Sequence, residues 1–376
     1  MKILFTGGGT GGHIVPALAI ARELRILNPS TNSGQFFYMG PKDEFGDMLL
    51  SQEGFAGVFH VAAGKMRRYG GVKAILQNII DVFFRTPLGF FQALLKLFFL
   101  APDLIMSKGG YGSLPATFAG WLLGIPIFLH ESDSVPGLAN RIAAKFSLGI
   151  FTSFPNTERF PKGKTELTGN PVRKEIMAGS REEAKQYFSL QGGKPLVFIM
   201  GGSQGAQRIN EMLLIILEEA LKTIEIIHQT GEKNFAEMQK ETKAVLSEGN
   251  GKYYHPVPFL KETELRDAYA VSDLIITRAG SGSIFEIAAL GKPAILIPLP
   301  ESAQNHQVKN AYEYAKTGAA IVLEEANLTP HFFLEKLKDL LQNSQELEKM
   351  SLAAKTFAKP EAAKNIAQYL LEYLAR

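Results

Sequence analysis

Short apolar runs alternate with longer segments of helical periodicity along most of this chain. The runs at 2–5, 36–39, 125–129, 196–200 and 294–298 each contain mainly aliphatic or aromatic residues, and all but 2–5 lie directly beside a Gly or Pro residue. Runs of this length and composition are typical of strands that are buried on both faces, as in parallel sheets covered by helices. The pattern therefore predicts an α/β protein built from parallel strands and crossover helices.

The pattern also repeats within the chain. Residues 103–114 (DLIMSKGGYGSL) match residues 273–284 (DLIITRAGSGSI), and a strand followed by a glycine turn occurs both at 3–10 and at 197–204. We predict two Rossmann-like doubly wound domains, at 1–168 and 169–350, and a helical segment at 351–376 that crosses back towards the first domain. Ala116 occupies the place of Glu286, so the second domain is the candidate for holding a nucleotide.

The second copy of this repeat has the features of a ligand-binding turn. Gly280 and Gly282 allow a bound group to approach the backbone, and the N–H groups at the start of the following helix attract anions. Glu286 lies one turn into that helix, where its carboxylate would be placed to bind a sugar diol. Ser283 and Glu286 also have the spacing of a helix capping box, and the spacing alone does not decide between the two interpretations.

The composition of the chain favours a globular protein with two domains and excludes sites that need cysteine. With 46% apolar residues, 376 residues are enough for two domains that each have a core. The absence of cysteine excludes disulfides and thiolate metal sites. Residues 1–170 carry 16 Lys and Arg against 11 Asp and Glu, a net charge of +5, whereas the remainder carries 24 against 26, a net charge of −2. The first strand starts directly at the amino terminus, which is not the pattern of a secretion signal.

Gly7, Gly9 and Gly12 formally satisfy the dinucleotide fingerprint G-x-G-x-x-G. A dinucleotide fold would also place an acidic residue at the end of the second strand, and here that strand ends in Gly40 and Pro41. We therefore do not expect a nicotinamide or flavin cofactor. His13 closes this run of small residues, so its ring is a candidate to face a ligand.

Residues 62–101 combine a basic, glycine-flanked loop with many large apolar side chains. Arg85, Pro87 and Lys96 interrupt the apolar pattern, so we expect the segment to be too short and too charged to span a bilayer. Two interpretations remain. The segment forms two core helices, or its Phe residues and the nearby Lys and Arg residues lie on an anionic membrane surface.

Several motifs together resemble the MurG family, the N-acetylglucosaminyltransferases that complete the lipid-linked peptidoglycan precursor. They lie, in order along nearly the whole chain, at 8–13 (GGTGGH), 109–111 (GGY), 130–131 (HE), 137–140 (GLAN), 169–173 (GNPVR), 201–206 (GGSQGA) and 281–286 (SGSIFE), followed by Gln307. The resemblance implies a GT-B fold, with two Rossmann-like domains that face each other across a cleft. The first domain would hold the acceptor and the second would hold UDP-N-acetylglucosamine.

The resemblance also implies roles for individual residues. In the second domain it places Ser203 at the diphosphate, the backbone of Leu260 at the uracil, Glu286 at the ribose and Gln307 at the sugar hydroxyls. The remaining substrate-binding candidates are Thr10, Gly11, Gly12, Asp133, Asn140 and Arg173, together with the helix start at Ser281, Gly282 and Ser283. Many family members have Asn in place of Asp133, which puts a sugar contact by that residue in doubt.

The implied reaction is an attack by a sugar hydroxyl of a membrane-anchored acceptor on the anomeric carbon of the donor, with inversion. This chemistry needs a general base, for which His13 and then Glu131 are the candidates. Helix N-termini can stabilise the leaving diphosphate, so we expect no metal and no other cofactor. The expected partners are UDP-N-acetylglucosamine, lipid-linked muramoyl peptide and the anionic cytoplasmic face of the cell membrane, and not nucleic acid. The alternatives are a UDP-N-acetylglucosamine epimerase and a periplasmic-type binding protein, the latter disfavoured because no secretion signal is recognised.

Overall fold

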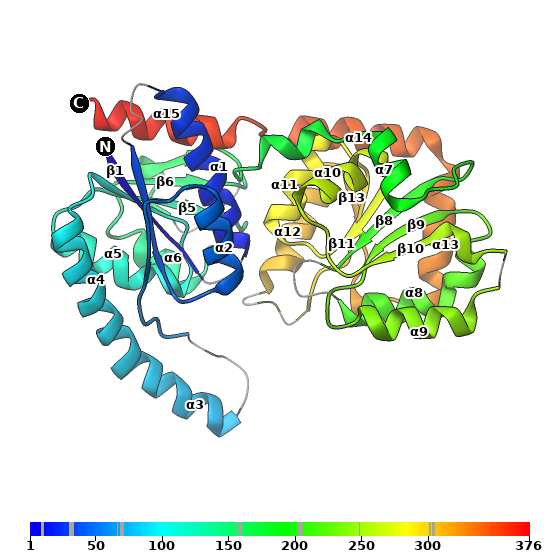
Figure 1. The fold of residues 1–376 in the computed structure, drawn as a ribbon, viewed down its shortest axis with the longest axis horizontal. Coiled ribbons are helices and arrows are strands. Elements are labelled where there is room, and N and C mark those ends of the chain that lie inside the picture. The colour runs from blue at the N-terminus through cyan, green and yellow to red at the C-terminus, as the bar shows by residue number, and fades with distance from the viewer. Residues whose placement is uncertain are drawn as a thin grey trace. The chain divides into compact units, whose positions relative to one another are not determined.

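The computed structural model consists of two compact units (Figure 1). One comprises Met1–Val172 and Pro360–Arg376, and the other comprises Arg173–Lys359. The sequence had placed these divisions at 168/169 and 350/351. The structure describes all residues except 9–10, 30–33, 66, 68–70, 156, 158–159, 202–205, 248, 301 and 303–304.

The first unit contains a seven-stranded parallel sheet in the order β3-β2-β1-β4-β5-β6-β7. Its strands are β1 (Lys2–Thr6), β2 (Gln35–Gly40), β3 (Gly57–His60), β4 (Leu104–Ser107), β5 (Ile127–Glu131), β6 (Gly149–Thr152) and β7 (Thr165–Leu167). Its helices are α1 (Gly11–Leu27), α2 (Glu44–Gln52), α3 (Gly71–Ile80), α4 (Thr86–Leu100), α5 (Leu114–Leu122), α6 (Leu138–Ala143) and α15 (Ala362–Leu374). Every residue of β4, β5 and β6 is buried, as expected for strands covered on both faces.

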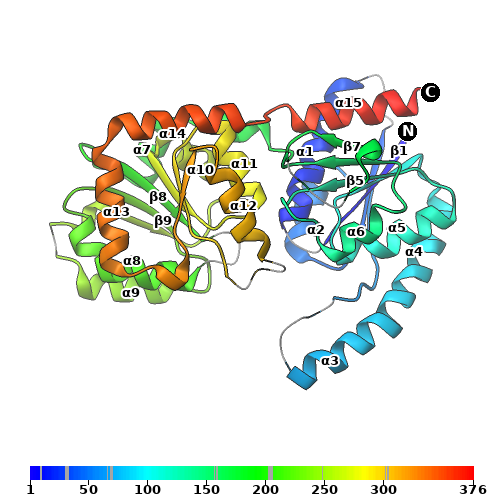
Figure 2. The ribbon, with the colours of Figure 1, turned by 180° about the vertical axis from the view of Figure 1, so that it is seen from behind.

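The last helix of the chain belongs to this first unit. Ile366, Ala367 and Leu370 of α15 are buried in one cluster with Ile14 and Leu18 of α1. The two helices lie side by side on one face of the sheet in both views (Figure 2). Helix α15 therefore completes the core of a domain whose other elements lie in the first half of the chain.

The Phe-rich segment is one nearly continuous helix, in which a π-helical turn, η1 (Asp81–Arg85), joins α3 to α4. Only α4 packs on the sheet, through Ala93 and Leu97, and α3 extends beyond the sheet (Figure 1). The interpretation as two core helices was wrong, because most of the large apolar side chains on this segment are exposed: Ile75, Leu76, Ile79, Ile80, Val82, Phe83, Phe84, Leu88, Phe91, Leu95, Phe98 and Phe99.

The expectation about the length of this segment also needs correction. Among the described residues, Ala74–Leu100 is long and apolar enough to cross a membrane by length and composition alone. The tertiary structure argues against a spanning orientation, because Ala93 and Leu97 of α4 are fully buried in a cluster with Leu4 of β1 and Ile105 of β4.

The second unit contains a six-stranded parallel sheet in the order β10-β9-β8-β11-β12-β13. Its strands are β8 (Leu196–Met200), β9 (Glu225–Gln229), β10 (Tyr254–Val257), β11 (Leu274–Thr277), β12 (Ala294–Leu296) and β13 (Ala320–Val322). Its helices are α7 (Arg181–Phe188), α8 (Gln207–Ala220), α9 (Phe235–Val245), α10 (Glu262–Val271), α11 (Ser281–Leu290), α12 (His306–Ala315), α13 (Pro330–Gln342) and α14 (Ser344–Phe357). In each unit the order of the central strands reverses beside a glycine turn, which is where open α/β sheets bind ligands.

Candidate active site

In the second unit, the turn between β11 and α11 is open. Gly280 is the residue that caps α11, and Ser281 is the first residue of that helix. A Cβ atom added to either Gly280 or Gly282 would meet no atom within 4 Å. The backbone N–H groups at the start of α11 therefore border space that a ligand can enter, and the helix dipole favours an anionic one.

The capping-box interpretation of Ser283 and Glu286 was wrong. The helix begins two residues before Ser283, so Ser283 lies inside its first turn and Glu286 in its second. Neither residue occupies its capping-box position. The carboxylate of Glu286 instead accepts a hydrogen bond from Arg173 Nη2 at 3.2 Å and another from the Tyr269 hydroxyl at 3.2 Å.

These contacts fix the orientation of the Glu286 side chain. Arg173 also donates from Nη1 to Glu262 Oε2 at 3.0 Å, so one guanidinium bridges α10 and α11. Burial disfavours the charge of Arg173, but the two carboxylates outweigh this effect and raise its pKa. Burial raises the pKa of the Tyr269 hydroxyl well above its usual value, and Glu286 adds to the rise. The hydroxyl therefore remains a donor, and Glu286 still has oxygen lone pairs for a ligand diol.

Two other predicted residues of the second unit lie in segments that follow the carboxyl ends of β10 and β12. Leu260 follows β10, and its backbone N–H donates to Gln229 Oε1 at 3.3 Å. Gln307, in the first turn of α12, accepts a bond from Leu299 N through Oε1 at 3.0 Å, which leaves its amide NH₂ group as the part that can donate to a ligand. Ser203 lies outside the described residues, so the structure does not place it.

The corresponding turn of the first unit is filled by side chains of the protein itself. A Cβ atom at Gly109 would lie 2.1 Å from Asn140 Oδ1, and one at Gly110 would lie 3.0 Å from His13 Cε1. Asn140 Oδ1 accepts the backbone N–H of Gly110 at 2.8 Å. The two copies of the repeat therefore differ, because the turn in the second unit has space that the turn in the first unit lacks.

Glu131 holds this filled turn in place. Its Oε2 accepts from Asn140 Nδ2 at 2.7 Å, and its Oε1 accepts from Asp133 N at 2.9 Å. Burial raises the pKa of Glu131 to about 8, while the N–H groups of Asp133 and Asn140 oppose the rise. Asn140 thus joins the Glu131 carboxylate to the backbone of Gly110. Asp133 contributes its backbone to the same network.

Lys108, which follows β4, is a buried residue of this region that sequence reasoning did not identify. Its Nζ donates to His130 Nδ1 at 2.6 Å, Ser132 Oγ at 2.7 Å and Asn170 Oδ1 at 3.3 Å. Burial lowers the pKa of Lys108 to about 7. The nearby carboxyl groups of Glu131 and Asp133 act to raise this pKa and offset only part of the effect of burial. The internal repeat could have identified Lys108, because Lys108 aligns with Arg278 in the second copy. Arg278 is also a cation that follows a strand, and it forms an ion pair with Glu325.

His13 lies in the first turn of α1, with its ring beside Gly8 and Gly110. Its Nδ1 lies 3.4 Å from the carbonyl oxygen of Lys108. Because a carbonyl only accepts, Nδ1 carries the proton in this contact and Nε2 is the basic nitrogen. Gly11 and Gly12 form the start of the same helix, and Thr10 lies outside the described residues.

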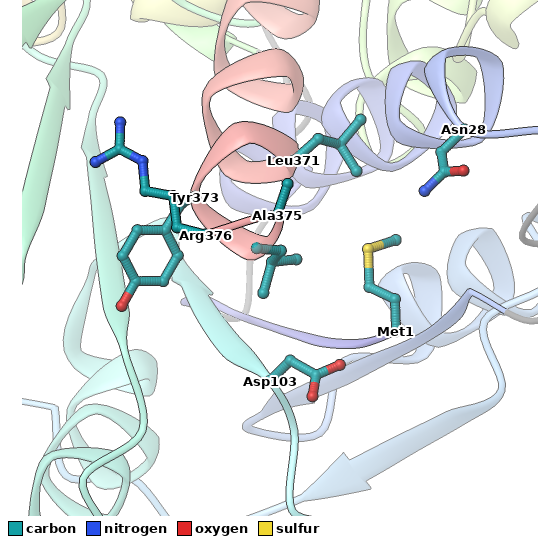
Figure 3. Close-up of a pocket in the computed structure, with 8 residues that line it drawn as sticks. Met1, Asn28, Asp103, Leu371, Tyr373, Ala375 and Arg376 are labelled. Carbon is teal, nitrogen blue, oxygen red and sulfur yellow. The ribbon is translucent and has the colours of Figure 1, made fainter.

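One pocket of the first unit does not lie at these residues. It measures about 690 Å³ and lies at the amino ends of β1 and β4. Met1, Asn28 and Asp103 line it together with Leu371 and Tyr373 of α15 (Figure 3). Parallel sheets place functional residues at the carboxyl ends of their strands, so we do not assign this pocket to the active site. Within the described part of the chain, no cluster of three or more His, Asp or Glu residues is arranged to hold a metal ion.

Two parallel sheets, each with a glycine turn at its strand reversal, form the two-domain α/β arrangement of the GT-B fold. Residues 3–152 match the glycosyltransferase family 28 N-terminal domain, and residues 196–366 match the glycosyltransferase family 28 C-terminal domain. The chain is therefore a glycosyltransferase.

Full-length relatives identify the family within this class. The chain is 37% identical over 373 residues to the UDP-N-acetylglucosamine–N-acetylmuramyl-(pentapeptide) pyrophosphoryl-undecaprenol N-acetylglucosamine transferase 2 of Bacillus cereus, covering 99% of both chains. It is 37% identical over 369 residues to the corresponding transferase of Halothermothrix orenii, covering 96% of both. The solved structure of Acinetobacter baumannii MurG is similar over 99% of both chains, with a TM-score of 0.73 and 26% identity. The chain belongs to the MurG family.

A UDP-GlcNAc 2-epimerase from Neisseria meningitidis is also similar in structure, with a TM-score of 0.68 over 99% of this chain and 100% of that one. Its sequence identity is only 16%. This similarity shows a shared fold and does not favour the epimerase alternative.

Proposed function

We propose that this glycosyltransferase moves N-acetylglucosamine from UDP-N-acetylglucosamine to the muramoyl sugar of a lipid-diphosphate-linked peptide, with inversion at the anomeric carbon. The observation that carries the proposal is the open turn at Gly280 and Gly282, beside a carboxylate that Arg173 and Tyr269 hold in position. Such a site provides a diphosphate with N–H donors and a ribose with an anionic acceptor.

The proposed donor roles are those that the resemblance to the MurG family implies, and this arrangement supports them. The first turn of α11, with Ser281, Gly282 and Ser283, stabilises the diphosphate as it leaves. Glu286 accepts from the ribose hydroxyls, the backbone of Leu260 contacts the uracil, and Gln307 donates to the sugar hydroxyls. Arg173 acts through Glu286, because its guanidinium bonds that carboxylate. Ser203 remains a proposed diphosphate contact.

The acceptor roles fall to the first unit. His13 Nε2 removes the proton from the attacking hydroxyl, since Nδ1 is directed at the Lys108 carbonyl. Thr10, Gly11 and Gly12 directly precede His13 in the sequence and remain proposed contacts of the donor. Glu131 fits a positioning role better than that of a base, because its side chain is buried and its oxygens bind Asn140 and the Asp133 backbone, which tie it to the turn at Gly110. Asn140 transmits this positioning to Gly110.

We also propose that the first unit works at the cytoplasmic face of an anionic membrane without spanning it. Many of its exposed apolar side chains lie on α3, η1 and α4, and Arg67 and Arg85 lie close to them. A helix that buries one face on the sheet and exposes Phe residues on the other suits binding in the membrane interface. Phe84→Gln with Phe98→Gln should reduce sedimentation with anionic vesicles, and Ile215→Gln, an exposed apolar position of the second unit, should not. Equal sedimentation of both variants would contradict this assignment.

The activity is tested by incubating the purified protein with UDP-N-acetylglucosamine and a lipid-diphosphate-linked muramoyl peptide. We expect UDP release that requires the acceptor, and a product whose new linkage has the β configuration. Conversion of UDP-N-acetylglucosamine without any acceptor would favour an epimerase instead. No reaction with or without the acceptor would overturn the proposed substrates.

A further inference from the structure

One buried charge of the first unit has no part in the reaction described above. Lys108 directly follows β4, and only 2% of its surface is exposed. A buried ammonium loses the hydration that stabilises its charge. Replacing buried ionic groups by apolar side chains of similar volume is often neutral or stabilising, so stability alone gives little reason for a lysine at this position.

The ammonium of Lys108 has an acceptor for each of its three N–H donors. Its Nζ lies 2.6 Å from His130 Nδ1, 2.7 Å from Ser132 Oγ and 3.3 Å from Asn170 Oδ1. His130 Nδ1 is an acceptor because His130 Nε2 lies 3.0 Å from the carbonyl oxygen of Gly169, to which it can only donate. Burial and the charge of Lys108 both lower the pKa of His130 well below its usual value, so the ring stays neutral.

Lys108 joins several segments at one edge of the sheet. The three acceptors of its ammonium lie at the end of β5, directly after β5 and in the segment that follows β7. Its backbone N–H donates to the carbonyl oxygen of Thr6, at the end of β1, at 2.7 Å. Its own carbonyl oxygen accepts from His13 Nδ1, in the first turn of α1, at 3.4 Å. The residue therefore connects the proposed base to the carboxyl ends of three paired strands, β1, β4 and β5.

The carbonyl group of Lys108 is held from two directions. On one side, the bonds of the ammonium fix the Lys108 side chain. On the other side, Gly109 and Gly110 have φ angles of 79° and 78°, which glycine adopts without strain, and Asn140 Oδ1 holds the N–H of Gly110 at 2.8 Å. A rotation of this carbonyl would release the proton on His13 Nδ1. The ring could then place its proton on Nε2, which would no longer accept one.

We propose that Lys108 is a positioning residue of the transfer reaction, whose buried ammonium keeps His13 in the tautomer that has a basic Nε2. The inference rests on the proposed function, because that function assigns the general base to His13. Lys108 acts through His13 and not by contact with a substrate. The charged groups that face its ammonium are Glu131 and Asp133, which favour the charged form of Lys108 against the effect of burial.

Nitrogen NMR of protein labelled with ¹⁵N-histidine tests the tautomer directly and without substrate. The chain has seven histidines, and His13→Ala identifies the signals of His13. In the unmodified protein, at a pH where the ring is neutral, we expect the proton of His13 on Nδ1. In Lys108→Met, which keeps the length of the side chain and removes its charge, we expect the proton to be shared between both ring nitrogens. An unchanged tautomer in the folded variant would overturn the proposal.

Turnover measurements separate positioning of the base from a general structural effect. With the lipid-linked acceptor, Lys108→Met should lower kcat by about 10–100-fold, as expected for a misplaced catalytic group, with KM for UDP-N-acetylglucosamine within a few-fold of normal. In the His13→Ala background the same substitution should change kcat much less, because the group that Lys108 positions is absent. An equal factor in both backgrounds is the result expected of a merely structural residue, and it would refute the positioning role.

Lys292 of the second unit provides the matched control. Its Nζ donates to the carbonyl oxygens of Ala270 at 3.0 Å and Ser272 at 2.7 Å, and burial lowers its pKa to about 8. Lys292→Met therefore also removes a charge held by several bonds, at a place outside the proposed site. It should lower the temperature of thermal unfolding and leave both kcat and the tautomer of His13 unchanged. A change of the tautomer in this control would show that the signal reports general destabilisation, which would count against the proposal.

Ser132→Ala is the milder variant if Lys108→Met does not fold. It removes one acceptor of the ammonium and leaves the charge of Lys108 in place. The proton of His13 should then move partly to Nε2, and an Nδ1 tautomer as complete as in the unmodified protein would contradict the proposal. Absence of transfer by the unmodified protein would instead contradict the proposed function, while the NMR experiment would still decide whether Lys108 sets the tautomer of His13.

Discussion

Replacing Glu286 by Gln tests the donor site at the atom on which its assignment depends. The substitution preserves the size of the side chain and removes its charge. Arg173 keeps its second partner, Glu262, at 3.0 Å, so it is not left as an isolated buried charge. We therefore expect the second unit to remain folded, with a loss of unfolding free energy within the ~1–3 kcal/mol that separates a charged hydrogen bond from a neutral one.

The expected loss of UDP affinity follows from the same contact. A hydrogen bond to a charged group contributes about 1.5–3 kcal/mol, which corresponds to roughly 10–150-fold in the dissociation constant. Titration calorimetry of Glu286→Gln with UDP measures this change. The matched control is Glu262→Gln, which removes the other carboxylate from Arg173 but leaves Glu286 in place. We expect this control to weaken UDP binding by only a few-fold.

A second ligand distinguishes a ribose contact from a general disturbance of the turn. The unmodified protein should bind 2′-deoxy-UDP more weakly than UDP, because Glu286 then accepts one hydroxyl fewer. In Glu286→Gln this preference for UDP should largely disappear, since the charged acceptor is already absent. A preference of unchanged size in the folded variant would refute the assignment of Glu286 to the ribose.

Three further predictions follow from single contacts. In Gly282→Ala, a methyl group that meets no protein atom should stabilise α11 by ~0.5–1 kcal/mol in thermal unfolding yet weaken UDP binding at least tenfold, and unaltered UDP binding would contradict an occupied turn. In His13→Ala, turnover should fall by roughly 10²–10⁴-fold with UDP affinity retained, and turnover within a few-fold of normal would transfer the base to another group. Burial lowers the pKa of His228 from 6.5 to about 3, so the native state resists protonation and stability present above pH 6.5 is lost as the pH falls. Urea unfolding should therefore show ~2 kcal/mol less stability at pH 5 than at pH 8, and His228→Gln should reduce this difference.

The internal repeat and the apolar runs were sufficient to predict two parallel sheets and the glycine turns that follow their strands. Strands such as β1 and β11 are largely apolar and are followed by glycine turns, and these features are local. The resemblance to the MurG family was equally visible, because its motifs are short and keep their order. The strands, the glycine turns and the family motifs depend on residues that are adjacent in the chain, so the sequence alone could predict them.

The role of Glu286 could not be read in this way, because spacing allowed both a capping box and a ligand carboxylate. The position where the helix begins excluded the capping box, and the carboxylate is oriented by Arg173 and Tyr269, which lie 113 and 17 residues away in the chain. Lys108 was missed for the same reason, since its partners His130, Ser132 and Asn170 meet it only when β4 and β5 are paired and the chain after β7 returns to the same edge.

The sequence also could not determine which side chains of the exposed Phe-rich helix are buried. Its sequence is apolar enough for a core, and only the packing of α4 through Ala93 and Leu97 determined which side chains are buried. Apolar composition fixes how much surface a helix would bury, whereas the number of elements packed against it decides how much it does bury. The sequence by itself determined the fold class, the repeat and the family, and the tertiary structure decided which of two similar turns is open, which carboxylate is held ready and which apolar face is left exposed.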